Sequence, residues 1–152
     1  GRFDGVNVNG KDRNVIKGNT IVKARIGISL VDRNGDTSDE NKIQDNTILS
    51  SKNAGIVVKG KSNVVKGNTI DQSVFSGIMV DSLIGSISEG VIIKDNSITN
   101  SKGAGIEITV GSSSTVSKNI VVIGNTFAGN TDGPIDDQGT GTVKAGNTPS
   151  LM

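Results

Sequence analysis

The side chains that could do chemistry in this sequence are carboxylates, lysines and arginines, because it contains no histidine, tyrosine, cysteine or tryptophan. Three of them, Lys59, Asp81 and Glu107, lie within or directly after successive copies of one short apolar motif. Alternate residues of a strand share a face, so we predict that all three point outward on one face in three successive repeats. They are our candidates for binding a substrate, and we assign no catalytic residue. The alternative is a surface strand with charges of mixed sign.

The loop at residues 32–40 places oxygen-bearing side chains at alternate positions, namely Asp32, Asn34 and Asp36. Calcium loops use this spacing because Ca²⁺ takes oxygen ligands. The glycine at the sixth position and the glutamate at the twelfth position of the EF-hand loop are both missing here. Calcium bound by these three residues is therefore one hypothesis, and a polar surface loop with an Asn-Gly turn is the other.

The elements that must position these residues repeat along the chain. An octet similar to NVVKGNTI occurs at residues 14–21, 41–48, 63–70, 91–98 and 120–127, with a degraded last copy. A glycine followed by an alternating apolar strand starts at Gly5, Gly27, Gly55, Gly77, Gly105 and, more loosely, Gly133. These glycines recur after 22 or 28 residues, and the extra residues all fall in one corner, near 32–40, 82–90 and 111–118. A fixed period of this length indicates stacked structural repeats.

Short segments rich in valine, isoleucine and threonine, separated by glycine and asparagine, favour strands over helices. A unit of about 22 residues with three such strands fits a coil of a parallel β-helix, in which coils stack about 4.8 Å apart. We therefore predict an all-β fold: one single-stranded parallel β-helix of about six coils over residues 1–152, either a mature product or a segment of a longer protein. The expected inward columns are Ile28, Ile56, Ile78 and Ile106; Leu30, Val58, Val80 and Ile108; Ile16, Ile43, Val65, Ile93 and Val122; and Ile21, Ile48, Ile70, Ile98 and Phe127.

The asparagines Asn19, Asn46, Asn68, Asn96 and Asn125 occupy the same corner of successive coils in this arrangement. Asparagine tolerates the left-handed backbone conformation that a tight corner needs, and its amide can bond the next coil. We interpret these residues as a structural ladder and not as catalytic groups.

An outward column of lysines, Lys17, Lys66 and Lys94, accompanies the octets and could line a path for an anionic polymer. Stacked lysines repel one another unless carboxylates intervene, and Asp45 and Asp95 are adjacent to this column. A solvated, partly paired face is therefore the alternative.

The octets and the Gly-Ile strands, from about residue 5 to residue 147, resemble the repeats of the pectate-lyase-like superfamily of parallel β-helices. Within it they are most similar to proteins related to alginate epimerases and lyases. The resemblance implies right-handed coils, in line with the usual sense of parallel crossovers, and a polysaccharide groove on the face with the three charged candidates. It transfers no catalytic residue, because the enzymes of this group use histidine or tyrosine. Only Asp136 and Asp137 are similar to part of the aspartate cluster of galacturonan hydrolases.

Charge and composition give no reason to expect nucleic acid or membrane as a partner. The net charge is +1, and aromatic residues make up 2% of the chain. The chain therefore has neither a basic excess for phosphates nor aromatic platforms for bases. No apolar run approaches the roughly 20 residues that span a bilayer, so we expect no membrane insertion.

We expect an extracellular, periplasmic, cell-surface or virion-surface module that recognises an acidic polysaccharide along the Gly-Ile face and its loops, without a required cofactor. One alternative is a calcium-assisted polysaccharide lyase with Asp81 or Glu107 at the metal and Lys59 or an arginine as base. The other is a structural spike, fibre or assembly segment that self-associates through its open coil ends.

Overall fold

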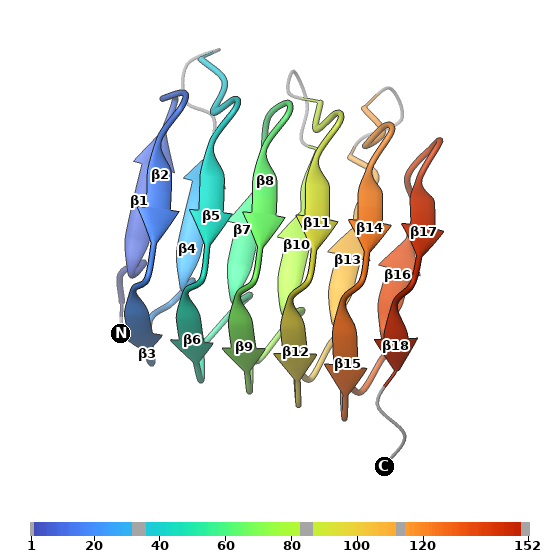
Figure 1. Ribbon diagram of the computed structural model, residues 1–152. Helices are drawn as coiled ribbons and strands as arrows, with labels where there is room; N and C mark the ends of the chain where they lie inside the picture. Colours follow the sequence, from blue (N-terminus) through green and yellow to red (C-terminus); the bar gives the residue numbers. More distant parts are fainter. Residues whose placement is uncertain (1, 32–35, 83–86, 112–114, 150–152) are drawn as a thin grey trace.

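The computed structural model describes residues 2–31, 36–82, 87–111 and 115–149. Within these ranges the regular secondary structure consists of short strands, and no helix that could cross a membrane occurs among them. Figure 1 shows the chain winding through successive coils, each of which contributes one strand to each of three parallel sheets. Each sheet has six strands, so the predicted six-coil parallel β-helix is confirmed.

The Gly-Ile motifs form the first sheet, here called sheet A. Its strands are β1 (Val6–Asn9), β4 (Ile28–Val31), β7 (Ile56–Val58), β10 (Ile78–Val80), β13 (Ile106–Ile108) and β16 (Ile135–Asp137). The first halves of the octets form sheet B, with β2 (Val15–Lys17), β5 (Lys42–Gln44), β8 (Val64–Lys66), β11 (Ile92–Lys94), β14 (Val121–Ile123) and β17 (Val143–Ala145). Their second halves form sheet C, with β3 (Thr20–Val22), β6 (Thr47–Leu49), β9 (Thr69–Asp71), β12 (Ser97–Thr99), β15 (Thr126–Ala128) and β18 (Thr148–Pro149).

The core is a set of columns in which like side chains stack on like. In sheet A, Ile28, Ile56, Ile78 and Ile106 are register partners in successive strands, and all are 0% exposed. The columns of sheets B and C are also buried, apart from half-buried Ile21 in the first coil. Burial of a side chain of this size contributes about 1.5–3 kcal/mol, so these columns drive the winding of the chain. The predicted inward columns are confirmed.

The glycine that opens each strand of sheet A permits close packing at the corner with sheet C. A Cβ atom on Gly77 would lie 2.3 Å from Cγ2 of Ile98 and 2.8 Å from the carbonyl oxygen of Gly105. Neither distance is compatible with a side chain. The repeated glycine therefore fixes how tightly the chain turns into sheet A.

Asn68 illustrates the corner between sheets B and C, where it is 1% exposed. Its Oδ1 accepts hydrogen bonds from the backbone nitrogen and from Nδ2 of Asn46 in the preceding coil, both at 3.0 Å. Its Nδ2 donates to the carbonyl oxygen of Ile43 at 3.0 Å and to Oδ1 of Asn96 at 2.9 Å. Side-chain bonds of this kind connect Asn19, Asn46, Asn68, Asn96, Asn125 and Asn147.

The left-handed residue at this corner is not the asparagine, and the sequence-based prediction is wrong on that point. The positive φ angle belongs to the residue before it: Gly67 has φ 65°, Asp45 has φ 55° and Asp95 has φ 56°. The asparagine itself keeps an ordinary backbone, and its side chain reaches along the axis toward the preceding coil.

A second set of asparagines was not recognised in the sequence. Oδ1 of Asn41 accepts bonds from the backbone nitrogen and from Nδ2 of Asn14, and Oδ1 of Asn63 accepts the same pair from Asn41. These residues open the first three octets, and the next two octets open with Val91 and Ile120, both 0% exposed. The corner that enters sheet B is therefore polar in the first coils and apolar in the later ones.

In the last coil, two core columns end in charged residues. Asp137 is the register partner of Ile108, and Lys144 is the register partner of Val122. Nζ of Lys144 donates to Oδ2 of Asp137 at 2.9 Å. An ion pair thus replaces two stacked aliphatic side chains.

Further hydrogen bonds hold the carboxylate of Asp137. The backbone nitrogen of Gly139 and Oγ1 of Thr142 donate to its Oδ1 at 3.0 and 3.1 Å. Burial alone would raise the pKa of Asp137, but the bonds from Lys144, Gly139 and Thr142 together outweigh burial. The pKa of this carboxyl group therefore lies below its ordinary value.

Candidate functional site

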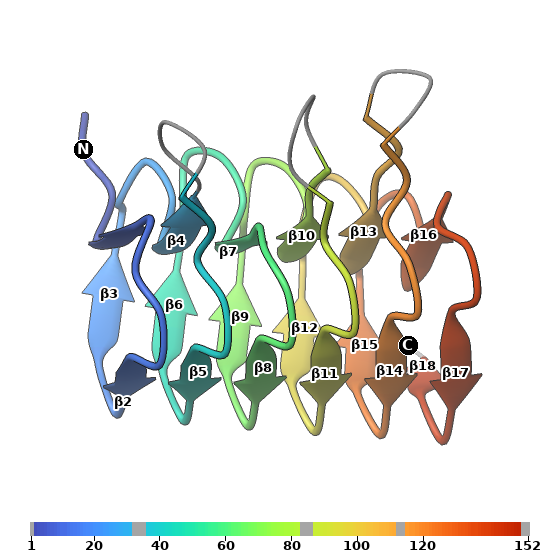
Figure 2. The same cartoon turned by 90° about the horizontal axis from the view of Figure 1, so that it is seen from above.

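The outer face of sheet A is hollowed into a groove of about 370 Å³ across the first four coils. Its floor includes Ser29 of β4, Val57 of β7 and Met79 of β10, which are register partners on the outward side. Its wall includes Arg25 and Ile26 from the connection between β3 and β4. Figure 2 shows these connections arching from sheet C to sheet A in successive coils.

The floor of this groove is more buried than a surface strand. Ser29 is 0% exposed, Val57 is 6% exposed and Ile26 is 8% exposed. Ile26, Ala54 and Val57 form a small apolar cluster outside the main core, with Met79 packed against it. Strand alternation places Val57 and Met79 on the outward side of sheet A, but the connections that cover them could not be inferred from it.

Lys59 and Asp81 face each other across adjacent coils at the edge of the groove. Nζ of Lys59 lies 3.1 Å from Oδ2 of Asp81, and the two side chains are 14% and 19% exposed. Oγ1 of Thr109 donates to Oδ1 of Asp81 at 3.2 Å. Both oxygens of Asp81 and the ammonium group of Lys59 are therefore engaged.

Glu107 lies on the same outer face but in a different column. Its register partners are Met79 and Asp136, and its Oε2 accepts a hydrogen bond from Oγ of Ser76. It is not among the residues that line the groove. The structure therefore brings Lys59 and Asp81 together and leaves Glu107 in a separate contact.

A second ion pair at the groove was missed by the sequence-based reasoning. A terminal nitrogen of Arg25 lies 2.8 Å from Oδ1 of Asp4, and the two side chains are 49% and 4% exposed. Nδ2 of Asn7 also donates to Oδ2 of Asp4 at 3.0 Å. Asp4 and Arg25 lie one and two residues before the glycines of adjacent motifs, a spacing that could have revealed this contact.

The predicted calcium loop is only partly described. Asp32 and Asn34 lie outside the described residues, whereas Asp36 is exposed and borders a hollow of about 430 Å³ together with Lys11 and Asp12. Within the ranges that the structure describes, no group of three or more carboxylates could hold a metal ion. Calcium at this loop stays a prediction.

The arrangement of Lys59, Asp81 and Glu107 does not favour the alternative of a calcium-assisted lyase. Asp81 and Glu107 accept hydrogen bonds from different partners and do not converge on one point, and the ammonium of Lys59 is held by Asp81. What the site offers is a trough with a mostly apolar floor, in which Ser29 is the polar member, and hydrogen-bonding groups at its edges. Such a surface is suited to binding a ligand, because apolar contact supplies affinity and a few precisely positioned polar groups supply orientation and specificity.

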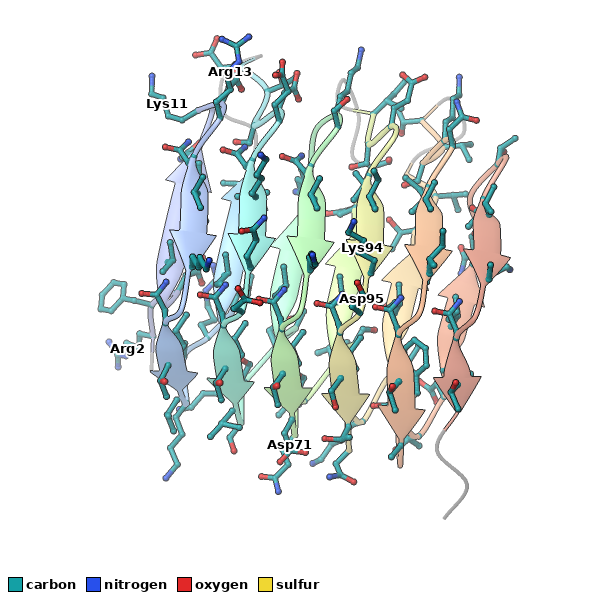
Figure 3. All side chains as sticks on the ribbon, in the orientation of Figure 1. Arg2, Lys11, Arg13, Asp71, Lys94 and Asp95 are labelled. Carbon is teal, nitrogen blue, oxygen red and sulfur yellow. The ribbon has the colours of Figure 1, made fainter. Side chains whose placement is uncertain are left out.

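The lysine column lies on another face of the rod, the outer face of sheet B. Its register places Lys66 beside Lys94, and Nζ of Lys17 lies 3.7 Å from a carboxylate oxygen of Asp45. Figure 3 shows Lys94 and Asp95 on the side turned toward the viewer, whereas sheet A lies behind. The two candidate binding faces are therefore separate surfaces.

Comparison with known proteins identifies solved structures with a similar architecture. A comparison with curated protein sequences gives no match. Among solved structures, the periplasmic alginate epimerase AlgG matches with a TM-score of 0.80 and 19% identity over 98% of this chain. Its single mutant matches with a TM-score of 0.80 and 18% identity over 97%, and its double mutant with a TM-score of 0.73 and 18% identity over 98%.

In each case this chain spans 36% of the epimerase, and at this identity the likeness concerns the fold. The predicted resemblance to pectate-lyase-like β-helices is confirmed at that level. The family described as "Right handed beta helix region" matches residues 2–148, which also confirms the predicted hand. The chain therefore belongs to the right-handed β-helix family.

Proposed function

We propose that this chain is a polysaccharide-binding module that holds its ligand in the groove on the outer face of sheet A. The observation that carries the proposal is the groove itself, a trough of about 370 Å³ with polar edges, whose floor combines the apolar Val57 and Met79 with Ser29. A sugar chain has the complementary surface, with apolar ring faces and a periphery of hydroxyl groups. The likeness to an alginate epimerase supports a carbohydrate ligand, and it supports a periplasmic or extracellular location.

Isothermal titration calorimetry against alginate, pectate and neutral glycans tests this proposal. We expect binding by the wild type and weaker binding by Met79→Lys, because Met79 contributes to the floor of the groove and a lysine would bring a charge into it. Lys66→Met on the outer face of sheet B is the matched control and should bind as the wild type does. Absence of binding to every glycan at about millimolar concentration, a Kd that corresponds to about 4 kcal/mol, would contradict the proposal.

A measurement of ultraviolet absorbance with the same uronate polymers, with and without calcium, separates binding from elimination. A lyase forms an unsaturated product that absorbs in the ultraviolet. We expect a flat trace, because the carboxylates on this face do not converge on a common point.

A further inference from the structure

We propose that the groove takes an uncharged, hydroxyl-rich stretch of polysaccharide, which runs along the rod axis between Phe3 and Phe75. The inference rests on the proposed function and specifies its ligand class and binding residues. Three features support it: the compensation of charge in the groove, its apolar floor, and the position of the exposed aromatic side chains.

The charges at the groove compensate each other in pairs. Arg25 is held by Asp4 at 2.8 Å, and Lys59 is held by Asp81 at 3.1 Å. One arginine and one lysine are thus each paired with an aspartate, and the net charge of these four side chains is zero. A groove with this balance exerts little net attraction on a polyanion.

A carboxylate on the ligand would also have to compete with aspartates that are already in place. The side chains of Asp4 and Asp81 are only 4% and 19% exposed, so removing their cations would leave nearly buried carboxylates without partners. A hydroxyl group can donate to a carboxylate and accept from a cation without separating the pair, because each carboxylate offers about four lone-pair positions. Neutral sugars therefore fit these pairs better than uronates do.

The exposed aromatic residues lie in one row beside the groove. The backbone nitrogen of Arg25 donates to the carbonyl oxygen of Phe3, that of Asn53 to Arg25, and that of Phe75 to Asn53. Arg25 and Asn53 line the groove, so Phe3 and Phe75 extend the same wall on either side. They are 81% and 54% exposed, and the remaining phenylalanine, Phe127, is buried in the core.

The spacing of these two rings sets the direction of the ligand. Phe3 and Phe75 are three coils apart in the row, which is about 14 Å at about 4.8 Å per coil. The apolar floor formed by Val57 and Met79 lies alongside this stretch. A chain of sugar rings along the axis could stack on both phenylalanines and place hydroxyl groups at the two ion pairs.

Calorimetry with defined hexasaccharides tests the proposal. Cellohexaose and mannohexaose are the neutral probes, and hexamers of alginate and galacturonate are the acidic ones. We expect the neutral probes to bind more tightly, with a Kd that changes less than twofold between about 0.1 and 1 M salt, where the Debye length falls from about 10 to about 3 Å. Tighter, salt-sensitive binding of the uronates would overturn this inference and leave the proposed function standing. No binding of any oligosaccharide or polymer would overturn both.

Variants locate the site. Phe75→Ala and Phe3→Ala should each weaken binding of the neutral probe by about tenfold, as removal of a stacking ring does elsewhere, without moving the urea midpoint. Lys59→Met combined with Asp81→Leu removes one ion pair while keeping its volume, and should weaken binding similarly. Val22→Ala, at a side chain 55% exposed on the outer face of sheet C, is the control and should bind as the wild type does. Unchanged affinity in both phenylalanine variants would place the ligand elsewhere and overturn the inference.

Discussion

Asn68 shows at the scale of a single residue why the octet repeats. Its side chain satisfies backbone groups of the preceding coil and of its own coil, and it donates to the side chain of Asn96 in the next coil. It does so at a position where water is excluded, and unpaired backbone groups are costly there. The asparagine therefore joins coils rather than merely turning the chain.

We expect Asn68→Ala to destabilise the protein by about 3 kcal/mol or more, because it leaves the backbone nitrogen of Asn46 and the carbonyl oxygen of Ile43 buried without their partners. Asn19→Ala is the matched control at the exposed end of the same column. Its side chain only donates, to Lys17 and Asn46, so its loss should cost about 1 kcal/mol. Urea denaturation measures both values, and equal losses would contradict this account of the column.

The glycine before each strand of sheet A gives a second prediction at this scale. Gly77→Ala would force a methyl group to within 2.3 Å of Ile98, and we expect a loss of about 2 kcal/mol or more in the free energy of unfolding. Gly133→Ala is the control, because a Cβ atom there meets nothing within 4 Å and only the positive φ of 89° opposes it. That variant should lose about 1 kcal/mol by urea denaturation. A larger loss at Gly133 than at Gly77 would show that steric fit does not select this glycine.

At the scale of the strand, the last coil departs from the pattern of the others. Strands β16 and β17 place Asp137 and Lys144 where the preceding coils have aliphatic side chains. The hydrogen bonds to Asp137 favour its ionised form and lower its pKa in the folded state. The stability that this group contributes is therefore complete above the pKa of the unfolded chain and is lost as the pH falls through the lower pKa of the folded state.

The Asp137–Lys144 ion pair predicts that the stability to urea depends on pH. A comparison of the wild type with Asp137→Asn isolates this dependence. At about pH 7 the wild type should unfold at higher urea concentration than Asp137→Asn, and the difference should shrink below about pH 4 as the carboxyl group becomes protonated. The other carboxylates titrate in both proteins, so their effects cancel in the difference. A gap between the two urea midpoints that stays constant from about pH 7 to about pH 3 would contradict the role assigned to this ion pair.

The strands and their inward columns could be predicted from the sequence because the same alternation recurs in each copy of the motif. Where the copies differ, prediction failed. The second asparagine set of Asn41 and Asn63 was overlooked because later octets begin with apolar residues. The Asp137–Lys144 pair lies in the degraded final copy, where the alignment of the repeats gives little guidance.

Prediction of the candidate site was less complete, for a physical reason. Strand alternation indicates which side chains point outward, and it placed Lys59 and Asp81 in neighbouring coils. It says nothing about how the connections between sheets fold over that face, and these connections create the groove and bury Val57. Glu107 was grouped with the pair because all three positions face outward, although they belong to two columns.

At the scale of the whole molecule, the connections from sheet C to sheet A and the corner between sheets B and C are nearly constant. Coil lengths vary where sheet A leads into sheet B: β4 ends at Val31 and β5 begins at Lys42, whereas β7 ends at Val58 and β8 begins at Val64. Neighbouring asparagines at the constant corner are accordingly separated by 22 to 29 residues. Changes of length are thus confined to one edge of the rod. The frame made by the three sheets keeps its register regardless of the length of these connections.

This regularity predicts that a complete coil can be removed. Deletion of residues 55–76, one 22-residue unit, joins Ala54 to Gly77 and restores the motif at the junction. We expect a five-coil protein with the circular dichroism of β-structure, a cooperative transition and a lower Tm, because one interface between coils is lost. Deletion of residues 55–65 removes part of a coil and shifts the strand register, so it should not yield a folded protein. Similar thermal stability of the two deletions would contradict the repeat-based account.

The parallel pairing of all three sheets also determines how the rod would respond to force. The ladder bonds connect each strand to the coil before it and the coil after it, so they point along the long axis. Tension applied between the two ends would pull along these bonds, so a ladder could open bond by bond and coils should peel away singly at low force. A load applied across a coil would instead shear three ladders together. The molecule should therefore be mechanically weak along its length and strong across it.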